Sequence, residues 1–69
     1  MRYDYFNNMK MLSLTYANGS KVSINSDEIS SMHPIINEDF VAKTRIEIKN
    51  GKDVLVMETI EEILLTLKH

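Results

Sequence analysis

The chain contains two Asn-Gly pairs, and the residues around them repeat one pattern. Asn18-Gly19 and Asn50-Gly51 each lie between short segments in which apolar and polar residues alternate. The apolar positions that match in the two copies are Leu14, Val22 and Ile24 in the first and Ile46, Val54 and Val56 in the second. Asparagine and glycine tolerate positive φ, which both central residues of a type I′ turn require. The sequence therefore predicts two β-hairpins, each closed by a two-residue turn.

The alternation also gives approximate bounds for the strands. We expect strands at 10–16, 21–25, 43–49 and 53–57, with a short strand or turn near 29–32 that ends at His33-Pro34. Alternate residues face opposite sides of a strand. Leu12, Leu14 and Tyr16 share one face of the first strand, and Val54 and Val56 share one face of the last. The positions expected to face inward are Val22, Ile24, Ile46 and Ile48.

The last segment has the pattern of a capped amphipathic helix. Thr59 and Glu62 have capping-box spacing, in which the threonine hydroxyl and the glutamate carboxylate each accept a hydrogen bond from the other residue's amide. A helix over 59–67 would place one apolar stripe against the sheet. That stripe contains Ile60, Ile63, Leu64 and Leu67.

These elements define an α+β fold class that is mainly β. We expect a twisted antiparallel sheet or a small open barrel, built from two Asn-Gly hairpins and a short linking strand, with one C-terminal helix. Residues 1–10 are interpreted as an N-terminal extension, and 11–69 as a single domain.

Size and composition restrict how such a domain is stabilised. A chain of 69 residues has a small core, and this one has no cysteine and only two histidines. Without disulfides, self-association is the remaining common source of stability, so we expect a homo-oligomer. A net charge of −2 argues against nucleic acid as an obligatory partner. No segment has the length and hydropathy of a membrane span, and the polar N-terminus does not resemble a signal peptide, which favours a cytoplasmic location.

Strand 53–57 carries apolar residues on both faces, which is typical of a strand covered on both sides. Leu55 and Met57 lie on the face opposite Val54, and Leu65 lies off the helix stripe. These three residues are the candidate contact with a partner protein or a second copy. The alternative is that they complete the monomer core.

A second candidate surface is basic. Lys43, Arg45 and Lys49 have even spacing on the outward face of strand 43–49, and Lys21 is a candidate neighbour across the sheet. Such a stripe on a small barrel suggests nucleic-acid binding. Glu47 interrupts the stripe, however, and stacking aromatic residues are missing from it. A solvated face with cross-strand charge pairs is the favoured interpretation.

Other polar residues give weaker signals for chemistry. His33 follows Ser30 and Ser31, but no nucleophile-elbow glycines flank these serines. Glu38-Asp39 lacks the spacing of a calcium loop and is interpreted as loop charge. Glu58, Glu61 and Glu62 are explained by capping and by the helix dipole. No catalytic residue, cofactor or metal site is expected, and the protein is not expected to be an enzyme.

Part of the sequence is similar to a known family. The segment Thr44-x-Ile46-x-Ile48-x-Asn50-Gly51-Lys52 is followed by Val54-x-Val56-x-Glu58-Thr59-Ile60-Glu61-Glu62-Ile63. Together with Leu14-Thr15 and Asn18-Gly19, it resembles the flagellar FlbD family, also called the swarming-motility SwrD family, over residues 11–67. Two features depart from that pattern: the first ten residues are additional, and the segment from Pro34 to Lys43 is longer.

The resemblance implies a non-enzymatic accessory role in flagellar motility, exerted through protein–protein contact. Flagellar motor components are then the candidate partners. The resemblance brings no catalytic or cofactor residue with it. Two alternatives remain: a phage-type or mobile-element inhibitor or adaptor on the same scaffold, and a small-barrel nucleic-acid-binding protein.

Overall fold

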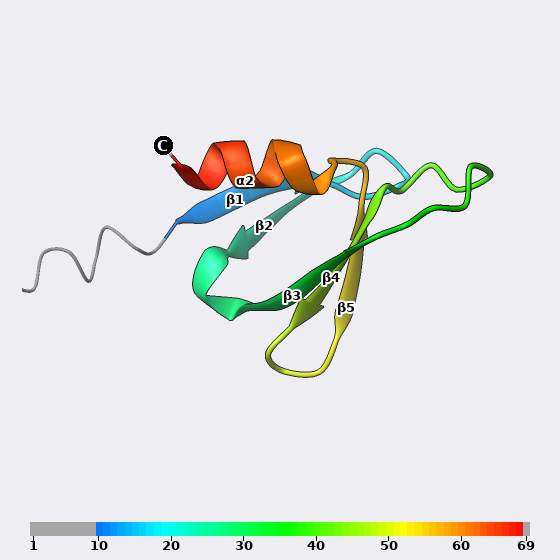
Figure 1. The fold of residues 1–69 in the computed structure, drawn as a ribbon. Helices are drawn as coiled ribbons and strands as arrows, with labels where there is room; N and C mark the ends of the chain where they lie inside the picture. The colour runs from blue at the N-terminus through cyan, green and yellow to red at the C-terminus, as the bar shows by residue number, and fades with distance from the viewer. Residues whose placement is uncertain (1–9, 69) are drawn as a thin grey trace, which may run out of the picture.

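The computed structural model describes residues 10–68, which form five strands, one short 3-10 helix and one α-helix (Figure 1). In chain order the elements are β1 (Met11–Thr15), β2 (Lys21–Asn25), η1 (Ser26–Glu28), β3 (Ile29–Pro34), β4 (Thr44–Ile48), β5 (Asp53–Val56) and α2 (Ile60–Lys68). The predicted N-terminal extension lies almost entirely outside the described residues.

The strands form two antiparallel sheets. β1 pairs with β2 in one sheet, and the other has the order β3-β4-β5. A single antiparallel bridge between Tyr16 and Val56 joins the end of β1 to β5, and the Met57 amide donates to the Thr15 carbonyl oxygen at 2.7 Å. The sheets do not close into a barrel. The predicted fold class, mainly β with one C-terminal helix, is confirmed.

Both Asn-Gly turns differ from the predicted type I′ geometry. Among the described residues only Gly19 and Gly51 have positive φ, at 92° and 95°. In the first hairpin the Tyr16 amide donates to the Ser20 carbonyl oxygen at 2.8 Å, and the Gly19 amide donates to the Tyr16 carbonyl oxygen at 2.9 Å. The loop therefore has three residues, with Asn18 inside a tight turn and glycine after it in the left-handed region.

The second hairpin has the same geometry, with Ile48 bonded to Lys52 and Gly51 bonded to Ile48 through the backbone. Each asparagine side chain accepts a hydrogen bond from the amide two residues later. These bonds join Asn18 to Ser20 at 2.9 Å and Asn50 to Lys52 at 3.0 Å. Such local bonds stabilise a tight turn without positive φ at asparagine, which explains why the two-residue prediction was wrong.

The segment predicted to be a short strand or turn is a strand, β3, and it ends at Pro34 as expected. Pro34 is the last residue of the strand, opposite Thr44, and β3 lies at the edge of its sheet. The missing proline N–H is tolerated there because an edge strand is bonded on one side only. The register shifts between Ile29 and Ser31, next to the corner where η1 joins the two sheets.

The core lies between the inner faces of the two sheets and one face of α2. Its buried apolar residues are Leu12, Leu14, Ile24, Ala42, Ile46, Val56 and Ile63. Thr44 is also fully buried, and its hydroxyl donates to the Glu58 carbonyl oxygen at 2.7 Å. Figure 1 shows α2 lying along β1, and the helix contacts both β1 and β3.

The helix buries a narrower stripe than predicted. Ile63 is fully buried, and Ile60 and Leu67 are half-buried, whereas Leu64 is 48% exposed, so its predicted burial is wrong. A short helix contacts the sheets along one line, and Leu64 lies beyond the edge of that contact. Leu12 and Leu14 are buried, whereas Tyr16 is exposed, because β1 ends before it and the chain turns. Within residues 10–68, no helix is long and apolar enough to cross a membrane.

Candidate functional site

The outer face of the three-stranded sheet carries a connected group of polar side chains. The strand register places Ser31, Glu47 and Asp53 in one row across β3, β4 and β5. The next row contains His33, Arg45 and Leu55. These odd-numbered positions lie opposite the core residues of the same strands, so all six side chains share the outer face.

Hydrogen bonds and ion pairs connect the two rows through Glu47. One Glu47 carboxylate oxygen accepts from the Ser31 hydroxyl at 2.6 Å, and the other accepts from Arg45 Nη1 at 2.8 Å. Arg45 Nη1 also contacts Asp53 Oδ2 at 3.2 Å, and His33 Nε2 lies 3.6 Å from Glu47 Oε1. The strands of this sheet are therefore tied together on their solvent side.

The network sets the charge state of its members. The hydrogen bonds that Glu47 accepts, first from Ser31 and then from Arg45, lower the pKa of Glu47 to about 2. The hydrogen bond that Arg45 donates to Glu47, with the further contact to Asp53, raises the pKa of Arg45 above its ordinary value. Near neutral pH Glu47 is therefore a carboxylate and Arg45 a guanidinium, and Arg45 Nη1 lies within 3.2 Å of both Glu47 and Asp53.

Ser31 Oγ and His33 Nε2 lie 3.0 Å apart, within the hydrogen-bond distance that a catalytic serine–histidine pair requires. A serine hydroxyl has one hydrogen, and the 2.6 Å contact directs it to the ionised Glu47. His33 Nε2 must then donate to Ser31 rather than accept from it. A nucleophilic serine requires the opposite direction, with the histidine as base. The arrangement suits a structural network better than acyl transfer.

The four residues of the candidate basic surface are divided between the two sheets. Lys21 belongs to β2, and its ammonium donates to the Thr15 hydroxyl at 3.1 Å. Lys43, Arg45 and Lys49 lie in or beside β4 of the other sheet, and Arg45 is paired with two acids. Lys43 and Lys49 are exposed.

A second polar cluster, which sequence reasoning missed, joins β1 to the start of the helix. The Glu58 carboxylate accepts hydrogen bonds from the Thr15 amide and the Thr15 hydroxyl, both at 2.9 Å. Partial burial opposes ionisation of Glu58, but the two bonds from Thr15 outweigh it, so the pKa of Glu58 lies below its usual range. Thr15 and Glu58 are 43 residues apart, and no local pattern signals their contact.

The candidate contact residues are all partly open to solvent. Leu55 and Met57 are each 39% exposed, and Leu65 is 58% exposed. Leu65 lies beside Leu64 on the outer face of α2, whereas Leu55 is on β5. The structure thus divides the three residues between a strand and a helix, and it adds Leu64, which the predicted stripe had assigned to the core.

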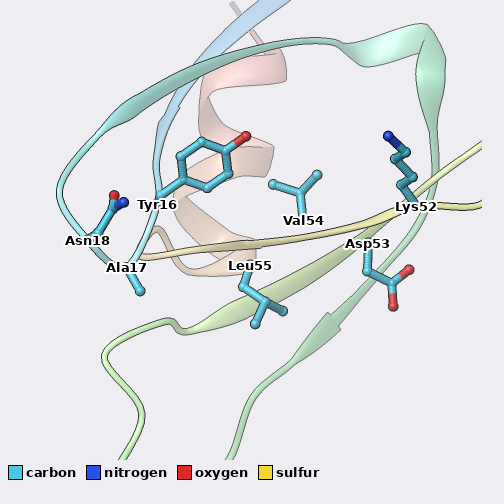
Figure 2. A pocket seen from close by; sticks show the side chains of 7 residues that line it. All are labelled: Tyr16, Ala17, Asn18, Lys52, Asp53, Val54 and Leu55. Atoms are coloured by element: carbon cyan, nitrogen blue, oxygen red, sulfur yellow. The ribbon is translucent and has the colours of Figure 1, made fainter.

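Two separate surface hollows lie beside these exposed leucines, one at Leu55 and one at Leu64 and Leu65. One, of about 580 Å³, lies between the β1–β2 turn and β5 (Figure 2). It is lined by Tyr16, Ala17, Asn18, Lys52, Asp53, Val54 and Leu55. The other, of about 480 Å³, is lined by Glu61, Leu64, Leu65 and Lys68 of α2. The hollow beside Leu55 and the hollow beside Leu65 have no residue in common.

The loop acids show local turn structure. The Asp39 amide donates to Asn37 Oδ1 at 2.9 Å, and Glu38 and Asp39 are both exposed. In the part of the chain that the structure describes, no three His, Cys, Asp or Glu side chains are grouped as metal ligands would be.

Comparisons with known proteins give no relative. No protein-family model, no curated protein and no solved structure matches this chain.

Proposed function

We propose that this protein is a small, non-enzymatic interaction protein that acts by protein–protein contact in flagellar motility. The observation that carries the proposal is the exposure of apolar side chains on a very small domain. Leu55 and Met57 on the sheet and Leu64 and Leu65 on the helix remain open to solvent. Leu64 and Leu65 are neighbours on α2, and adjacent exposed apolar side chains on a small protein favour a contact surface.

The resemblance to FlbD and SwrD sequences supplies the biological setting. The segment from Thr44 to Ile63, which carries most of that resemblance, contains β4, β5 and the first turn of α2. It therefore includes the strand that bears Leu55 and the turn that precedes Leu64 and Leu65. Flagellar motor components are the proposed partners, and the cytoplasm is the proposed location.

Gene deletion with complementation tests this function. In a flagellated bacterium that carries the gene, deletion should reduce swarming, and the wild-type gene should restore it. Leu55→Asp and Leu65→Asp should fail to restore swarming, because a carboxylate is costly to bury in an apolar contact.

The matched control is Ile36→Asp, which introduces the same charge at a loop side chain that is 85% exposed. This variant should restore swarming. Circular dichroism must show that each variant keeps its strand and helix signals. Normal swarming in the deletion strain would refute the motility role. Restoration by both leucine variants would refute the contact surface.

A further inference from the structure

Within residues 10–68, the edge of β5 opposite β4 pairs with another strand only at the bridge between Tyr16 and Val56. The Ile48 amide bonds to the Lys52 carbonyl oxygen, so the hydrogen-bonded positions of β5 that face β4 are the even-numbered ones. Asp53 and Leu55 therefore direct their backbone toward the opposite edge. The Met57 amide, which bonds to Thr15 of β1, confirms this direction. β1 ends at the bridge between Tyr16 and Val56 and turns away.

A surface hollow lies beside this edge. The hollow of about 580 Å³ lies where β1 would continue if it did not turn, between Tyr16 and Lys52. Figure 2 shows Tyr16, Val54 and Lys52 on one side of the β5 backbone, and Asp53 and Leu55 on the other.

The charges beside the hollow are unequal. Asp53 is already paired with Arg45 at 3.2 Å. Lys52 is exposed, and among residues 10–68 no acidic side chain forms an ion pair with it. Arg45 is shared between Asp53 and Glu47, whereas Lys52 has no such acidic contact within the described residues, so Lys52 is the group at this edge that can pair with an anionic ligand group.

We propose that β5 binds an extended peptide segment of a partner protein by strand addition at Asp53 and Leu55. Main-chain hydrogen bonds to the β5 edge supply affinity, and alternate side chains supply specificity. Lys52 and Val54 are two residues apart and lie on the same face of β5. The peptide side chains that contact them should therefore also be two residues apart. The preferred segment has an apolar residue against Tyr16 and Val54, and an Asp or Glu two positions away against Lys52. The inference rests on the proposed role in protein–protein contact and specifies one partner type.

A random peptide library displayed on phage, selected against the full-length protein, tests the sequence preference. The selected peptides should share an acidic residue spaced two positions from an aliphatic or aromatic one. One synthetic selected peptide is then titrated calorimetrically. Lys52→Glu should weaken its binding at least about tenfold, because the variant replaces an attraction by a repulsion. Lys49→Glu is the matched control, since Lys49 lies in the adjacent turn and outside the hollow.

Backbone methylation of the same peptide tests strand addition itself. N-methylation removes one amide donor, so affinity should fall at every second peptide position and change little at the positions between. The proposal is overturned if no peptide is enriched, if methylation has no alternating effect, or if binding depends on Leu64 and Leu65 instead. Self-association that Lys52→Glu abolishes, without peptide binding, would assign the edge to a second copy.

The peptide assay tests strand addition, and the swarming assay tests the motility role, so either proposal can be rejected without the other. If Leu55→Asp abolishes swarming while no peptide is selected, the contact role stands and strand addition is rejected. If peptides bind with the alternating pattern while gene deletion leaves swarming normal, the peptide site stands and the motility role is rejected.

Discussion

At the scale of single residues, Glu58 connects parts of the chain that are far apart in sequence. Its carboxylate bonds to Thr15 at the end of β1, and its carbonyl oxygen accepts from the buried Thr44 hydroxyl of β4. The same residue directly precedes the N-cap Thr59 of α2. Glu58 therefore fixes where the helix leaves the junction of the two sheets.

Ionisation of Glu58 should contribute to stability in a pH-dependent manner. The pKa of Glu58 is lowered in the folded state, so its contribution is fully present above the unfolded pKa. That contribution is lost as pH falls through the folded pKa. Glu58→Gln should therefore lower the urea midpoint near neutral pH and have a smaller effect at an acidic pH below the ordinary glutamate pKa.

Urea denaturation of the wild type and the variant at both pH values measures this difference. Glu38→Gln is the control, because Glu38 is an exposed loop residue and should show no comparable change. Equal effects of Glu58→Gln at both pH values would show that ionisation of Glu58 is not the source of its contribution.

Turn residues show what a local sequence pattern can and cannot predict. The positions of both hairpins followed from Asn18-Gly19 and Asn50-Gly51, since few other residues adopt positive φ without strain. The turn type did not follow, because asparagine can either adopt positive φ or bond its side chain to the amide two residues later. The strand ends decide between these states through the pairing of Tyr16 with Ser20 and of Ile48 with Lys52.

At the scale of elements, the capping box is the sequence signal that the structure reproduces most directly. The Thr59 amide donates to Glu62 Oε1 at 2.8 Å, and the Glu62 amide donates to Thr59 Oγ1 at 3.1 Å. Thr59→Ala should destabilise the protein by about 0.5–2 kcal/mol, because it leaves an amide of the first helical turn unsatisfied. Thermal or urea unfolding measures the loss.

Thr66→Ala is the matched control in the same helix. The Thr66 hydroxyl bonds only to the Glu62 carbonyl oxygen within α2, and alanine has the higher helix propensity. This variant should retain wild-type stability or gain slightly. If both threonine variants lose equal stability, the cap is not what stabilises the start of the helix.

The contacts between elements were less predictable than the elements themselves. The period of the apolar residues identified the strands and the helix, but it placed Leu64 in the core and did not indicate the Ser31–Glu47–Arg45 network. Helical periodicity identifies an apolar face without fixing the width of its contact. The network depends on the register between β3 and β4, and a register shift next to Ser31 has no signature in the sequence.

At the scale of the whole molecule, the two sheets share one apolar core, but within residues 10–68 few hydrogen bonds join them directly. One bridge at Tyr16, the Thr15–Glu58 bonds and the packing of α2 on β1 and β3 connect them. The hollow beside β5 lies directly next to that junction. A partner strand at this edge would pair with β5 beyond the point where β1 turns away. Because the partner would bind only the folded protein, its binding should raise the free energy of unfolding.

Self-association is the remaining prediction at this scale. A chain of 69 residues without cysteine has few other sources of stability, and Leu55, Met57 and Leu65 are the predicted contact between copies. We expect a dimer whose population rises with protein concentration. Sedimentation equilibrium should show this rise for the wild type, and Leu65→Asp should lower the mass to that of a monomer. Ile36→Asp, which charges an exposed loop residue, should leave the dimer intact.

Circular dichroism separates loss of association from loss of folding. If Leu65→Asp lowers the mass while strand and helix signals persist, Leu65 lies in a contact between folded copies. If the variant unfolds, Leu65 is required for folding of the monomer. The interface is then tested with Leu55→Asp instead. A wild-type mass that stays monomeric at the highest concentrations would contradict self-association. The exposed leucines would then be assigned to contact with a different protein, because burying exposed apolar side chains in a contact is favourable in free energy.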